Sequence, residues 1–474
     1  MITKNMKIEQ IYTGCLAQGA YYITSNNEAI IIDPLRETKP YLERLERDGV
    51  TLKYIFETHF HADFVSGHLD LSQQTGAQIV YGPNAVAEFD FISATDNQIF
   101  KVGDIAIKVL HTPGHTMEST TYLLIDENGK ENAIFSGDTL FIGDVGRPDL
   151  AQKSASMTQD ELAATLFQSL RSKIMTLPDD VLVYPAHGAG SACGKNMSKE
   201  TVSTIGEQKL NNYALRANMT ESEFITEVTD GLLPPPAYFG MNVAMNKKGS
   251  QSFENVLNKG MKPIDVLDFE LLVEENNALI LDTRNSGDFS KGYIPQSINI
   301  GISGDFAPWV GSMIGNVDQA IILVTEIGKE EETVTRLSRV GFDNLMGFLN
   351  GGFQAWQNAG FEMDTIHRIT AEQFASEAKT DSHKILDIRR DGEYEAEHVD
   401  EAYSRPLANI NNWIKDINPS EHFYMYCAGG YRSMIASSIL QARGYRNFTE
   451  VEGGFNAIAK TNIPKTNFVC QSKL

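Results

Sequence analysis

The chain has 474 residues, of which 42% are hydrophobic and 22% charged, a balance typical of folded globular proteins. Because a single hydrophobic core stops growing at roughly 250 to 300 residues, this length predicts several domains. The formal net charge of −22 argues against nucleic acid or an anionic membrane surface as a partner, since both select for clustered Lys and Arg.

The N-terminal segment has no sustained apolar run after its lysines, and no stretch approaches the ~20 apolar residues that span a bilayer. We therefore expect a cytoplasmic protein. Four cysteines are too sparse for a disulfide framework, and each is weighed as a candidate reactive thiol. Cys15 and Cys470 have less support in this role than Cys193 and Cys427.

Up to about residue 190, apolar or β-branched runs alternate with polar turns and helix-like segments, which predicts an α/β fold. The runs begin at Ala29, Leu52, Ala77, Ile105, Thr120, Asn132 and Val181. Most of them carry His or Asp at or near the end, and polar residues at strand ends converge on one sheet edge, where sites are built. A helical segment and the proline run 234–236 follow, so we place the first boundary near residue 250.

His and Asp recur at these strand ends in order. The segment THFHADFVSGH supplies His59, His61 and Asp63 at alternating positions, so an extended chain turns all three side chains to one side, as a metal site requires. Later strand ends add three more candidates: His115, Asp138 and His187. A single histidine of this kind is usually structural, whereas six ordered positions favour a metal site.

This series resembles the metallo-β-lactamase superfamily over about the first 250 residues, which implies an αββα sandwich. The superfamily motif usually reads His-x-His-x-Asp-His, and Phe64 stands at its last position, which normally binds a second metal. The rest of the pattern resembles the persulfide dioxygenase branch. That resemblance implies one Fe(II) per chain, held by a facial set of two histidines and one carboxylate: His59, His115 and Asp138. The other positions are interpreted as orienting ligands or substrate: His61, Asp63 and His187.

Three residues beside the predicted metal pocket have two interpretations each. Arg147 suits a clamp on a substrate carboxylate, and an ion pair with Asp149 is the alternative. Tyr184, three residues before His187, is either a hydrogen-bond donor to the substrate or a packed strand tyrosine. Cys193 either carries or receives a persulfide, or is a small buried thiol.

The second half of the chain contains an internal repeat. The segment from Pro263 aligns without gaps with the segment from Arg368, and the glycine pairs 351–352 and 453–454 align further on. The alignment predicts two α/β units, residues 251–366 and 367–474, which we call the middle repeat and the last repeat.

The last repeat contains a candidate nucleophile, Cys427. The segment HFYMYCAGGYRSMIASSILQARGY predicts a buried strand, a Gly-containing loop and a helix, which together aim loop amides and a helix N-terminus at the thiol. Arg432 adds a positive charge at the end of the loop. With the flanking repeat segments, the CAGGYRS loop resembles the rhodanese family over roughly the last 110 residues. Four residues separate Cys and Arg, against five in cysteine phosphatases of similar construction, so the tighter loop suits a single sulfur.

The middle repeat departs from this pattern. Thr325 stands about where the nucleophile is expected, and acidic residues replace the Gly-rich turn and its Arg. A negative loop repels a persulfide anion. We therefore predict a catalytically silent rhodanese-like unit.

The predicted function has two parts. The first domain oxidises a low-molecular-weight thiol persulfide with O2 to sulfite at Fe(II), and Cys427 transfers sulfane sulfur to or from sulfite or thiosulfate. The main alternative is a zinc-dependent thioester hydrolase of the glyoxalase II kind fused to a rhodanese sulfur carrier, against which Phe64 argues. Nucleic acid and membranes are not expected as partners, whereas assembly into a homo-oligomer is compatible with the sequence.

Overall fold

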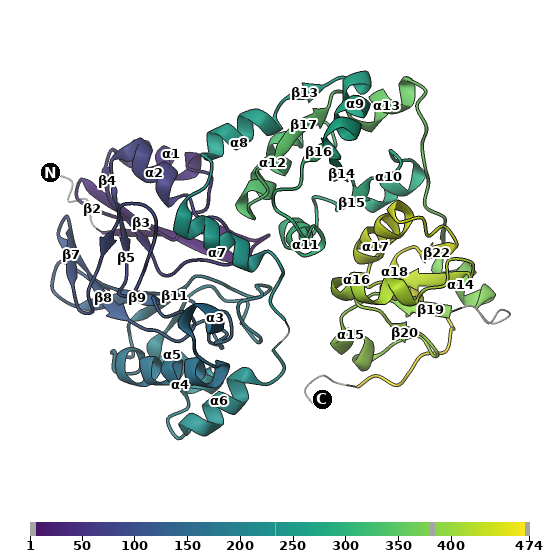
Figure 1. Cartoon of the computed structure of the whole chain (residues 1–474). Coiled ribbons are helices and arrows are strands. Elements are labelled where there is room, and N and C mark those ends of the chain that lie inside the picture. The colour runs from purple at the N-terminus through teal and green to yellow at the C-terminus, as the bar shows by residue number, and fades with distance from the viewer. Residues whose placement is uncertain (1–5, 233, 379–383, 470–474) are drawn as a thin grey trace. The chain divides into compact units, whose positions relative to one another are not determined.

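The computed structural model describes residues 6–232, 234–378 and 384–469, so Cys470 lies outside the described residues. The chain divides into two compact units. The first unit contains residues 1–255 and 337–341, and the second contains residues 256–336 and 342–474. Figure 1 labels the helices and strands of both units. Within the described ranges, no helix combines the length and the apolar composition needed to cross a bilayer.

The first unit contains two six-stranded sheets. One sheet runs in the order of the chain and contains β1 (Lys7–Thr13), β2 (Gln18–Ser25), β3 (Glu28–Ile32), β4 (Thr51–Glu57), β5 (Gln78–Tyr81) and β6 (Ile92–Ser93). The other runs in the order β12-β11-β10-β9-β8-β7 and contains β7 (Ile99–Val102), β8 (Ile105–His111), β9 (Thr120–Ile125), β10 (Glu131–Gly137), β11 (Leu182–Pro185) and β12 (Ser203–Thr204).

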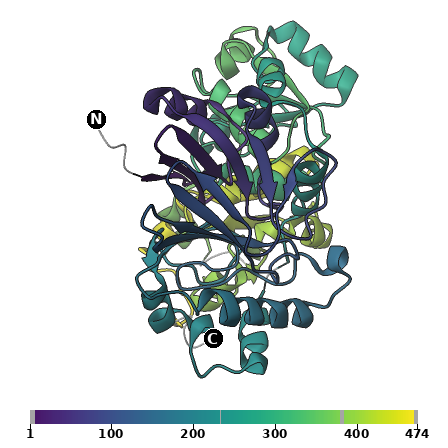
Figure 2. The same cartoon turned by 90° about the vertical axis from the view of Figure 1, so that its left-hand side faces the viewer.

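The two sheets share one apolar core, to which Phe56 of β4 and Phe135 of β10 both contribute. Helices cover the outer faces, as Figure 2 shows. The helices are α1 (Lys39–Asp48), α2 (His68–Thr75), α3 (Gln152–Ala155), α4 (Gln159–Ser169), α5 (Ile205–Asn211), α6 (Glu221–Thr229) and α7 (Phe239–Lys248). This arrangement confirms the predicted αββα sandwich. The seven predicted strands are present, and the sequence pattern missed β1, β2, β6, β7 and β12.

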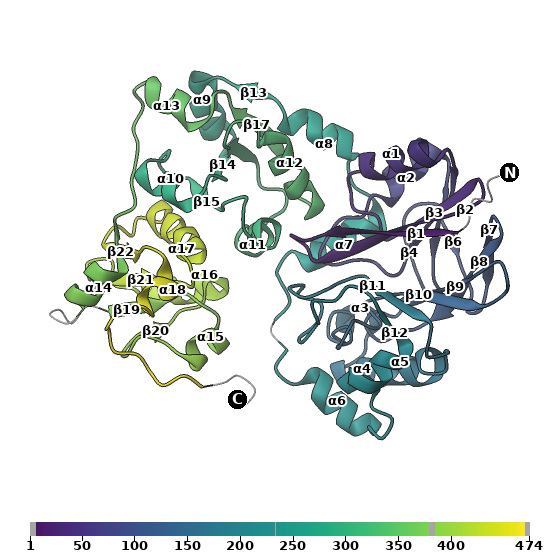
Figure 3. The same ribbon diagram turned by 180° about the vertical axis from the view of Figure 1, so that it is seen from behind.

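Helix α8 (Phe253–Gly260) leads into the second unit, which holds two five-stranded sheets of parallel strands. The middle repeat has the strand order β13-β17-β16-β14-β15, and the last repeat has the corresponding order β18-β22-β21-β19-β20. The two sheets are visible from behind in Figure 3. Identical topology confirms that the second half of the chain is built from two copies of one α/β fold.

The elements of the middle repeat are β13 (Pro263–Ile264), α9 (Val266–Asn276), β14 (Leu279–Asp282), α10 (Ser286–Lys291), β15 (Ile298–Asn299), α11 (Phe306–Met313), β16 (Ile321–Val324), α12 (Glu330–Arg339), β17 (Leu345–Leu349) and α13 (Gly352–Asn358). Those of the last repeat are β18 (Arg368–Ile369), α14 (Ala371–Glu377), β19 (Lys384–Asp387), α15 (Asp391–Ala396), β20 (Tyr403–Ser404), α16 (Ile410–Trp413), β21 (Phe423–Tyr426), α17 (Tyr431–Ala442), β22 (Phe448–Val451) and α18 (Gly454–Ile458).

The aligned Asp and Arg of the repeats make the same buried ion pair. Arg284 reaches Asp282 with its Nε at 3.0 Å, and Arg389 reaches Asp387 with its Nε at 3.0 Å. Each Arg also donates to a backbone carbonyl eight residues ahead. The two repeats therefore share the Asp-x-Arg spacing for a structural reason, because this ion pair connects the end of a central strand to the helix that follows.

Candidate metal centre and sulfur-transfer site

Three candidate ligands follow different strands of the first unit. His59 comes just after β4, Asp138 directly after β10, and His115 lies in the loop between β8 and β9. All three are buried, and their ligand atoms lie within 4.8 Å of one another. Asp138 Oδ2 is 3.5 Å from His115 Nε2 and 3.9 Å from His59 Nε2. Ligands about 2.1 Å from one ion have this mutual spacing.

Each of the two imidazoles is fixed through its other nitrogen. His115 Nδ1 is 2.9 Å from the carbonyl oxygen of Arg147, and His59 Nδ1 is 3.0 Å from Thr58 Oγ1. These contacts leave both Nε2 atoms on the side of Asp138. Burial, followed by the neighbouring histidines, holds the pKa of His59 well below its usual range. The ring is therefore neutral, with a lone pair available for a metal.

The carboxylate of Asp138 shows that the group fits a cation. Both of its oxygens are buried and have no hydrogen-bond partner among the described residues. An isolated buried carboxylate is costly unless a cation or hydrogen bonds compensate it. A metal held by His59, His115 and Asp138 supplies that compensation.

A second group lies beside the first. The ligand atoms of His61, Asp63 and His187 also lie within 4.8 Å of one another. His187 Nε2 is 3.4 Å from Asp63 Oδ2 and 3.6 Å from Asp138 Oδ1, so Asp138 stands between the two groups. The buried ring of Phe64 stacks on His61. The structure thus brings all six predicted strand-end residues together.

The imidazole of His61 lies beside two buried carboxylates, those of Asp33 and Glu57. Its Nε2 is 3.0 Å from Asp33 Oδ1 and 3.5 Å from Glu57 Oε2. Burial alone lowers the pKa of His61, but Asp33, then Glu57 and Asp63, outweigh it and raise the pKa to about 9. Glu57 Oε1 also lies 3.4 Å from His68 Nδ1. His68 is absent from the candidate ligand groups found among the described residues.

Gly146 is needed for the close approach of the ligand loops. A Cβ at this position would lie 2.0 Å from the carbonyl oxygen of Asp138 and 3.0 Å from His115 Nδ1. Any side chain there would push two ligands apart. The glycine therefore sets the distance between the β8–β9 loop and the segment after β10.

The thiol of Cys427 lies directly after β21 and is buried. Its Sγ accepts hydrogen bonds from the backbone N–H of Gly430, at 3.1 Å, and from Ser433 Oγ, at 3.3 Å. Both donors belong to the loop and the first turn of α17. The predicted cradle is therefore present in part, because the Gly430 amide at the N-terminus of α17 faces the sulfur.

The guanidinium of Arg432 is bound to a carboxylate. Its two terminal nitrogens donate to the carboxylate of Glu393, at 2.6 and 2.8 Å. This bidentate pair offsets the positive charge that the sequence predicted at the end of the loop. In the middle repeat, Thr325 follows β16 as Cys427 follows β21, and α12 begins with three glutamates.

Comparisons with known proteins bear on both sites. The metallo-β-lactamase superfamily profile matches residues 13–187, and the rhodanese-like domain profile matches residues 265–359 and 370–461. The human mitochondrial persulfide dioxygenase ETHE1 is 32% identical over 225 residues, which cover 47% of this chain and 80% of that protein. The chain therefore belongs to the persulfide dioxygenase family of the metallo-β-lactamase superfamily. It also carries two rhodanese-like domains.

Two further relatives show how far the likeness extends. A hydroxyacylglutathione hydrolase of Tolumonas auensis is 36% identical over 171 residues, which cover 35% of this chain and 60% of the hydrolase. A solved metallo-β-lactamase structure from Staphylococcus aureus aligns with a TM-score of 0.63 and 31% identity over 73% of this chain and 99% of its own. The metallo-β-lactamase domain and its fold are thus shown, and the family implies a metal at the His and Asp cluster.

Arg147 and Tyr184 each had two interpretations from the sequence, and the structure shows what their side chains contact. Arg147 makes a bidentate ion pair with Asp149, at 2.6 and 2.7 Å, as the alternative interpretation expected. Tyr184 is partly buried and stacks on Phe135, with ring centroids 5.4 Å apart, against the core between the sheets. Their roles in substrate binding stay predictions.

Cys193 lies at the metal cluster. Its ligand atom is within 4.8 Å of those of Asp138 and His187, and its side chain is buried. Burial raises the pKa of the thiol well above its ordinary value, and the charges of Asp138 and Asp63 raise it further. The sequence placed this cysteine on a loop bordering the pocket, and the structure has it there.

Several residues in or beside the sites were not predicted from the sequence. Asp33 ends the apolar run AIIIDP, and Glu57 precedes the metal motif, so both carried the strand-end signal. Tyr238 follows the proline run; it is buried, and after burial the charges of Asp63 and Cys193 contribute most to raising its pKa. In the rhodanese domain, Glu450 gave no sequence signal, because its partners come from elements distant in the chain.

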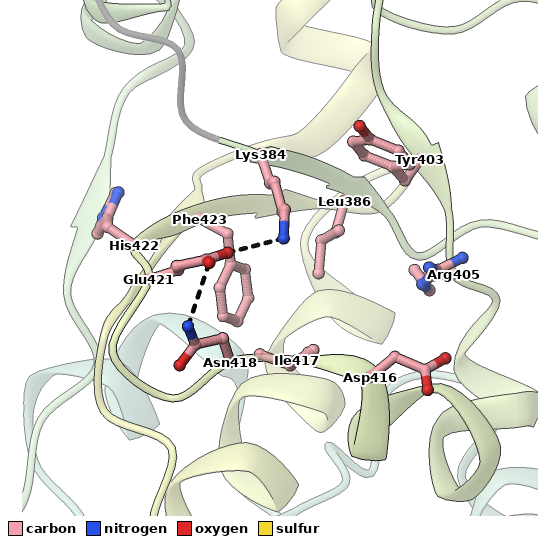
Figure 4. Close-up of a pocket in the computed structure, with 10 residues that line it drawn as sticks. All are labelled: Lys384, Leu386, Tyr403, Arg405, Asp416, Ile417, Asn418, Glu421, His422 and Phe423. Carbon is pink, nitrogen blue, oxygen red and sulfur yellow. Dashed lines mark hydrogen bonds and ion pairs between the residues drawn. The ribbon is translucent and has the colours of Figure 1, made fainter.

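A separate cavity of about 270 Å³ lies in the last repeat, and Cys427 is not among its lining residues (Figure 4). Lys384 and Phe423, which begin β19 and β21, line it. Its rim is closed by an ion pair of 2.7 Å between Lys384 and Glu421, to which Asn418 also donates. This cavity is distinct from the cradle of Cys427, since neither Cys427 nor its hydrogen-bond donors Gly430 and Ser433 line it.

Proposed function

We propose that the metallo-β-lactamase domain oxidises the terminal sulfur of a low-molecular-weight thiol persulfide to sulfite with O2, using one Fe(II). The observation that carries this proposal is the buried group of two imidazoles and one carboxylate, His59, His115 and Asp138, with both carboxylate oxygens unpartnered among the described residues. Two histidines and one carboxylate are the ligand set of non-heme iron oxygenases. The likeness to a protein named persulfide dioxygenase supports the substrate class.

The residues of this domain have distinct parts in the proposal. Bound Fe(II) would supply the redox chemistry that couples O2 to sulfur. Thr58 and the Arg147 carbonyl orient the two imidazoles. We propose that His61, Asp63 and His187 line the substrate side with Cys193, and that Arg147 and Tyr184 border it. Phe64 supports a single metal, because its phenyl ring has no nitrogen to bind the second metal, unlike the histidine usual at this position.

We further propose that Cys427, assisted by Arg432, carries sulfane sulfur to or from sulfite or thiosulfate. The amide of Gly430 and the hydroxyl of Ser433 support this role, because both donate to the sulfur and stabilise an anion there. The proposed division is residues 1–250 for oxidation, 251–366 for a silent rhodanese-like domain and 367–474 for sulfur transfer. Sulfite made at the first site is then a substrate for the second.

The rival function is zinc-dependent thioester hydrolysis, and the likeness to a hydroxyacylglutathione hydrolase supports it. Metal analysis with oxygen uptake on glutathione persulfide separates the two. We expect iron at one per chain and oxygen uptake that His115→Ala abolishes. His111→Ala is the matched control, since His111 lies in the same segment and bonds to the Met117 carbonyl instead. Stoichiometric zinc without oxygen uptake would contradict the proposal.

Sulfur transfer is tested separately. Cys427→Ser should abolish the exchange of sulfur between thiosulfate and sulfite or another acceptor, and should leave oxygen uptake unchanged. Cys15→Ser is the control thiol. Sulfur transfer retained in Cys427→Ser would refute the assignment of Cys427. A panel of persulfides in the oxygen assay would then identify the thiol that carries the sulfur.

A further inference from the structure

We propose that Ser433 and Glu450 form a proton relay for Cys427, in which the Ser433 hydroxyl passes the thiol proton to the Glu450 carboxylate. The proposal rests on the sulfur-transfer function assigned above to Cys427 and extends it. Ser433 touches the reacting sulfur, whereas Glu450 acts through Ser433 and is a positioning residue. Neither residue lies in the pattern that identified the loop.

The hydroxyl of Ser433 lies between two acceptors. Its Oγ is 3.3 Å from Cys427 Sγ and 2.6 Å from Glu450 Oε1. A hydroxyl has one proton, so it donates to only one of the two at a time. When it donates to Glu450, its lone pairs face the thiol and accept the S–H. When it donates to Cys427, the sulfur is a thiolate and the Glu450 side holds the proton. The two contacts therefore correspond to the two ends of one proton transfer.

Glu450 is placed to receive that proton. It is fully buried on β22, between Met425 of β21 and Arg368 of β18 in the sheet register. Burial raises the pKa of Glu450, although Arg368 and Ser433 oppose the shift. Arg368 Nε donates to Glu450 Oε2 at 2.6 Å, which leaves Oε1 to Ser433. The carboxylate is thus fixed in orientation and favours protonation more than an exposed glutamate does.

Other charged groups near the sulfur are already paired with one another. Arg432 is bound to Glu393, and Arg389 to Asp387. Glu452 is largely exposed and lies 3.7 Å from Arg368. Of the charged groups named, Glu450 is the one that a hydrogen-bonded hydroxyl links to Cys427.

The proton and electron balance is closed within these groups. The Cys427 thiol gives its proton to Ser433 Oγ as Ser433 gives its own proton to Glu450, which leaves a thiolate and a carboxylic acid. The thiolate attacks the outer sulfur of thiosulfate, a new S–S bond forms, the bond to the sulfonate sulfur breaks, and sulfite leaves with that electron pair. Transfer of the outer sulfur to an acceptor returns the thiolate, which recovers its proton by the same path.

The middle repeat supplies an internal comparison. There the pair Pro263 and Phe348 occupies the register position that Arg368 and Glu450 hold in the last repeat. Thr325 follows the strand that corresponds to β21. The silent copy therefore lacks the nucleophile, the carboxylate and its Arg together, as expected if the three act as one device.

The test measures alkylation of Cys427 by iodoacetamide across pH in the full chain, with the labelled peptide quantified by mass spectrometry. In the wild type we expect a plateau of reactivity below the pKa of an ordinary thiol, about 8.5, because the relay supplies thiolate without losing a proton to water. In Glu450→Gln we expect the plateau to vanish, with the rate falling about tenfold per pH unit. Ser433→Ala should lose the plateau in the same way. It replaces Glu450→Gln as the test if that variant does not fold, since Ser433→Ala keeps the ion pair between Arg368 and Glu450.

Two comparisons make the test decisive. The double variant Ser433→Ala/Glu450→Gln should be alkylated no more slowly than either single variant, because each single variant already blocks the only proposed proton path. Glu452→Gln, on the same segment, should keep the wild-type profile. Additive effects, or variant profiles parallel to the wild type, would overturn the relay. Sulfur transfer that persists in Cys427→Ser would instead overturn the proposed function, so the two failures are distinguishable.

Discussion

The phenyl ring of Phe64 lies stacked on the imidazole of His61, with ring centroids 4.3 Å apart and planes inclined by 28°. The ring is fully buried. It fills with hydrocarbon the position that carries a ligand imidazole in the usual superfamily motif. The cluster of His61, Asp63 and His187 is therefore left with three candidate ligands instead of four.

Replacing Phe64 with His should create a second metal position. The new nitrogen would complete a four-ligand set with the three residues above, and tetrahedral zinc is bound by such sets. After loading with excess zinc and desalting, elemental analysis should rise from one to two metals per chain. Phe60→His is the matched control, since Phe60 stacks on Tyr81 in the same segment and is outside the ligand groups. An unchanged metal content in Phe64→His would contradict this account of the site.

Glu9 should stabilise the first unit at neutral pH, and this contribution to the free energy of unfolding should be lost in acid. Burial alone raises the pKa of Glu9, but hydrogen bonds from Lys7, Arg44 and Arg47 outweigh it and lower the pKa from 4.5 to about 2. A depressed carboxyl pKa contributes stability that is present above about 4.5 and lost as pH falls through about 2. After allowance for solvent screening, we expect Glu9→Gln to cost about 1 kcal/mol at pH 7.

The measurement is chemical denaturation of wild type and variant at several pH values. The difference in unfolding free energy should shrink below pH 4.5 and disappear near pH 2. Glu46→Gln, an exposed position on α1, should show no comparable change. A difference that is constant across pH would mean that the ion pairs do not stabilise the fold.

Gly454 should tolerate no side chain. Its φ is +55°, and a Cβ would lie 2.2 Å from the carbonyl oxygen of Cys427 and 2.9 Å from the carbonyl carbon of Ala428. Both obstacles are backbone atoms of the sulfur-transfer loop, so the loop itself must move. We expect Gly454→Ala to reduce sulfur transfer at least ~100-fold, about 3 kcal/mol, while oxygen uptake is retained.

Gly352 of the middle repeat is the matched control for Gly454. Its φ is +62°, but its Cβ would lie 3.1 Å from the Thr325 carbonyl oxygen, a milder contact. Gly352→Ala should therefore cost about 1 kcal/mol of stability for the left-handed backbone and leave sulfur transfer nearly unchanged. Equal loss of transfer in both variants would show a general folding defect.

Much of this architecture could be predicted because its signals are local. Alternating His59, His61 and Asp63 after an apolar run, and Cys427 before a Gly-containing turn, place chemistry at strand ends whatever the tertiary details. The repeat was also readable, since Asp282 and Asp387 keep one spacing to their Arg partners.

The rest depended on contacts between distant parts of the chain. The hairpin of β1 and β2 was missed, although all of β2 is buried, because its partner strand β1 has no buried residue and carries no apolar run. Arg432 was expected to add a positive charge at the end of the loop, yet Glu393, 39 residues away in sequence, binds it and offsets that charge. Glu450 and Ser433 meet only through folding. Residues of this kind are found by geometry, since no local spacing specifies them.

Tyr431 gives the middle repeat a testable role in sulfur transfer. Tyr431 begins α17, next to Gly430, whose N–H donates to Cys427. Its hydroxyl donates to the carbonyl oxygen of Gly301 in the middle repeat at 2.7 Å, and its ring covers Gly304, where a Cβ would lie 2.5 Å away. The middle repeat therefore contacts the first turn of α17, directly after the residue whose amide donates to the sulfur.

Gly304→Ala should displace this turn and slow sulfur transfer about tenfold or more, because sub-ångström errors in donor position weaken anion stabilisation. Tyr431→Phe, which loses one hydrogen bond without a clash, should cost about 1 kcal/mol of stability and slow transfer less. Gly315→Ala is the control, since nothing lies within 4 Å of a Cβ at that position of the same repeat. Sulfur transfer at the wild-type rate in Gly304→Ala would show that the sulfur-transfer loop keeps its geometry without support from the middle repeat.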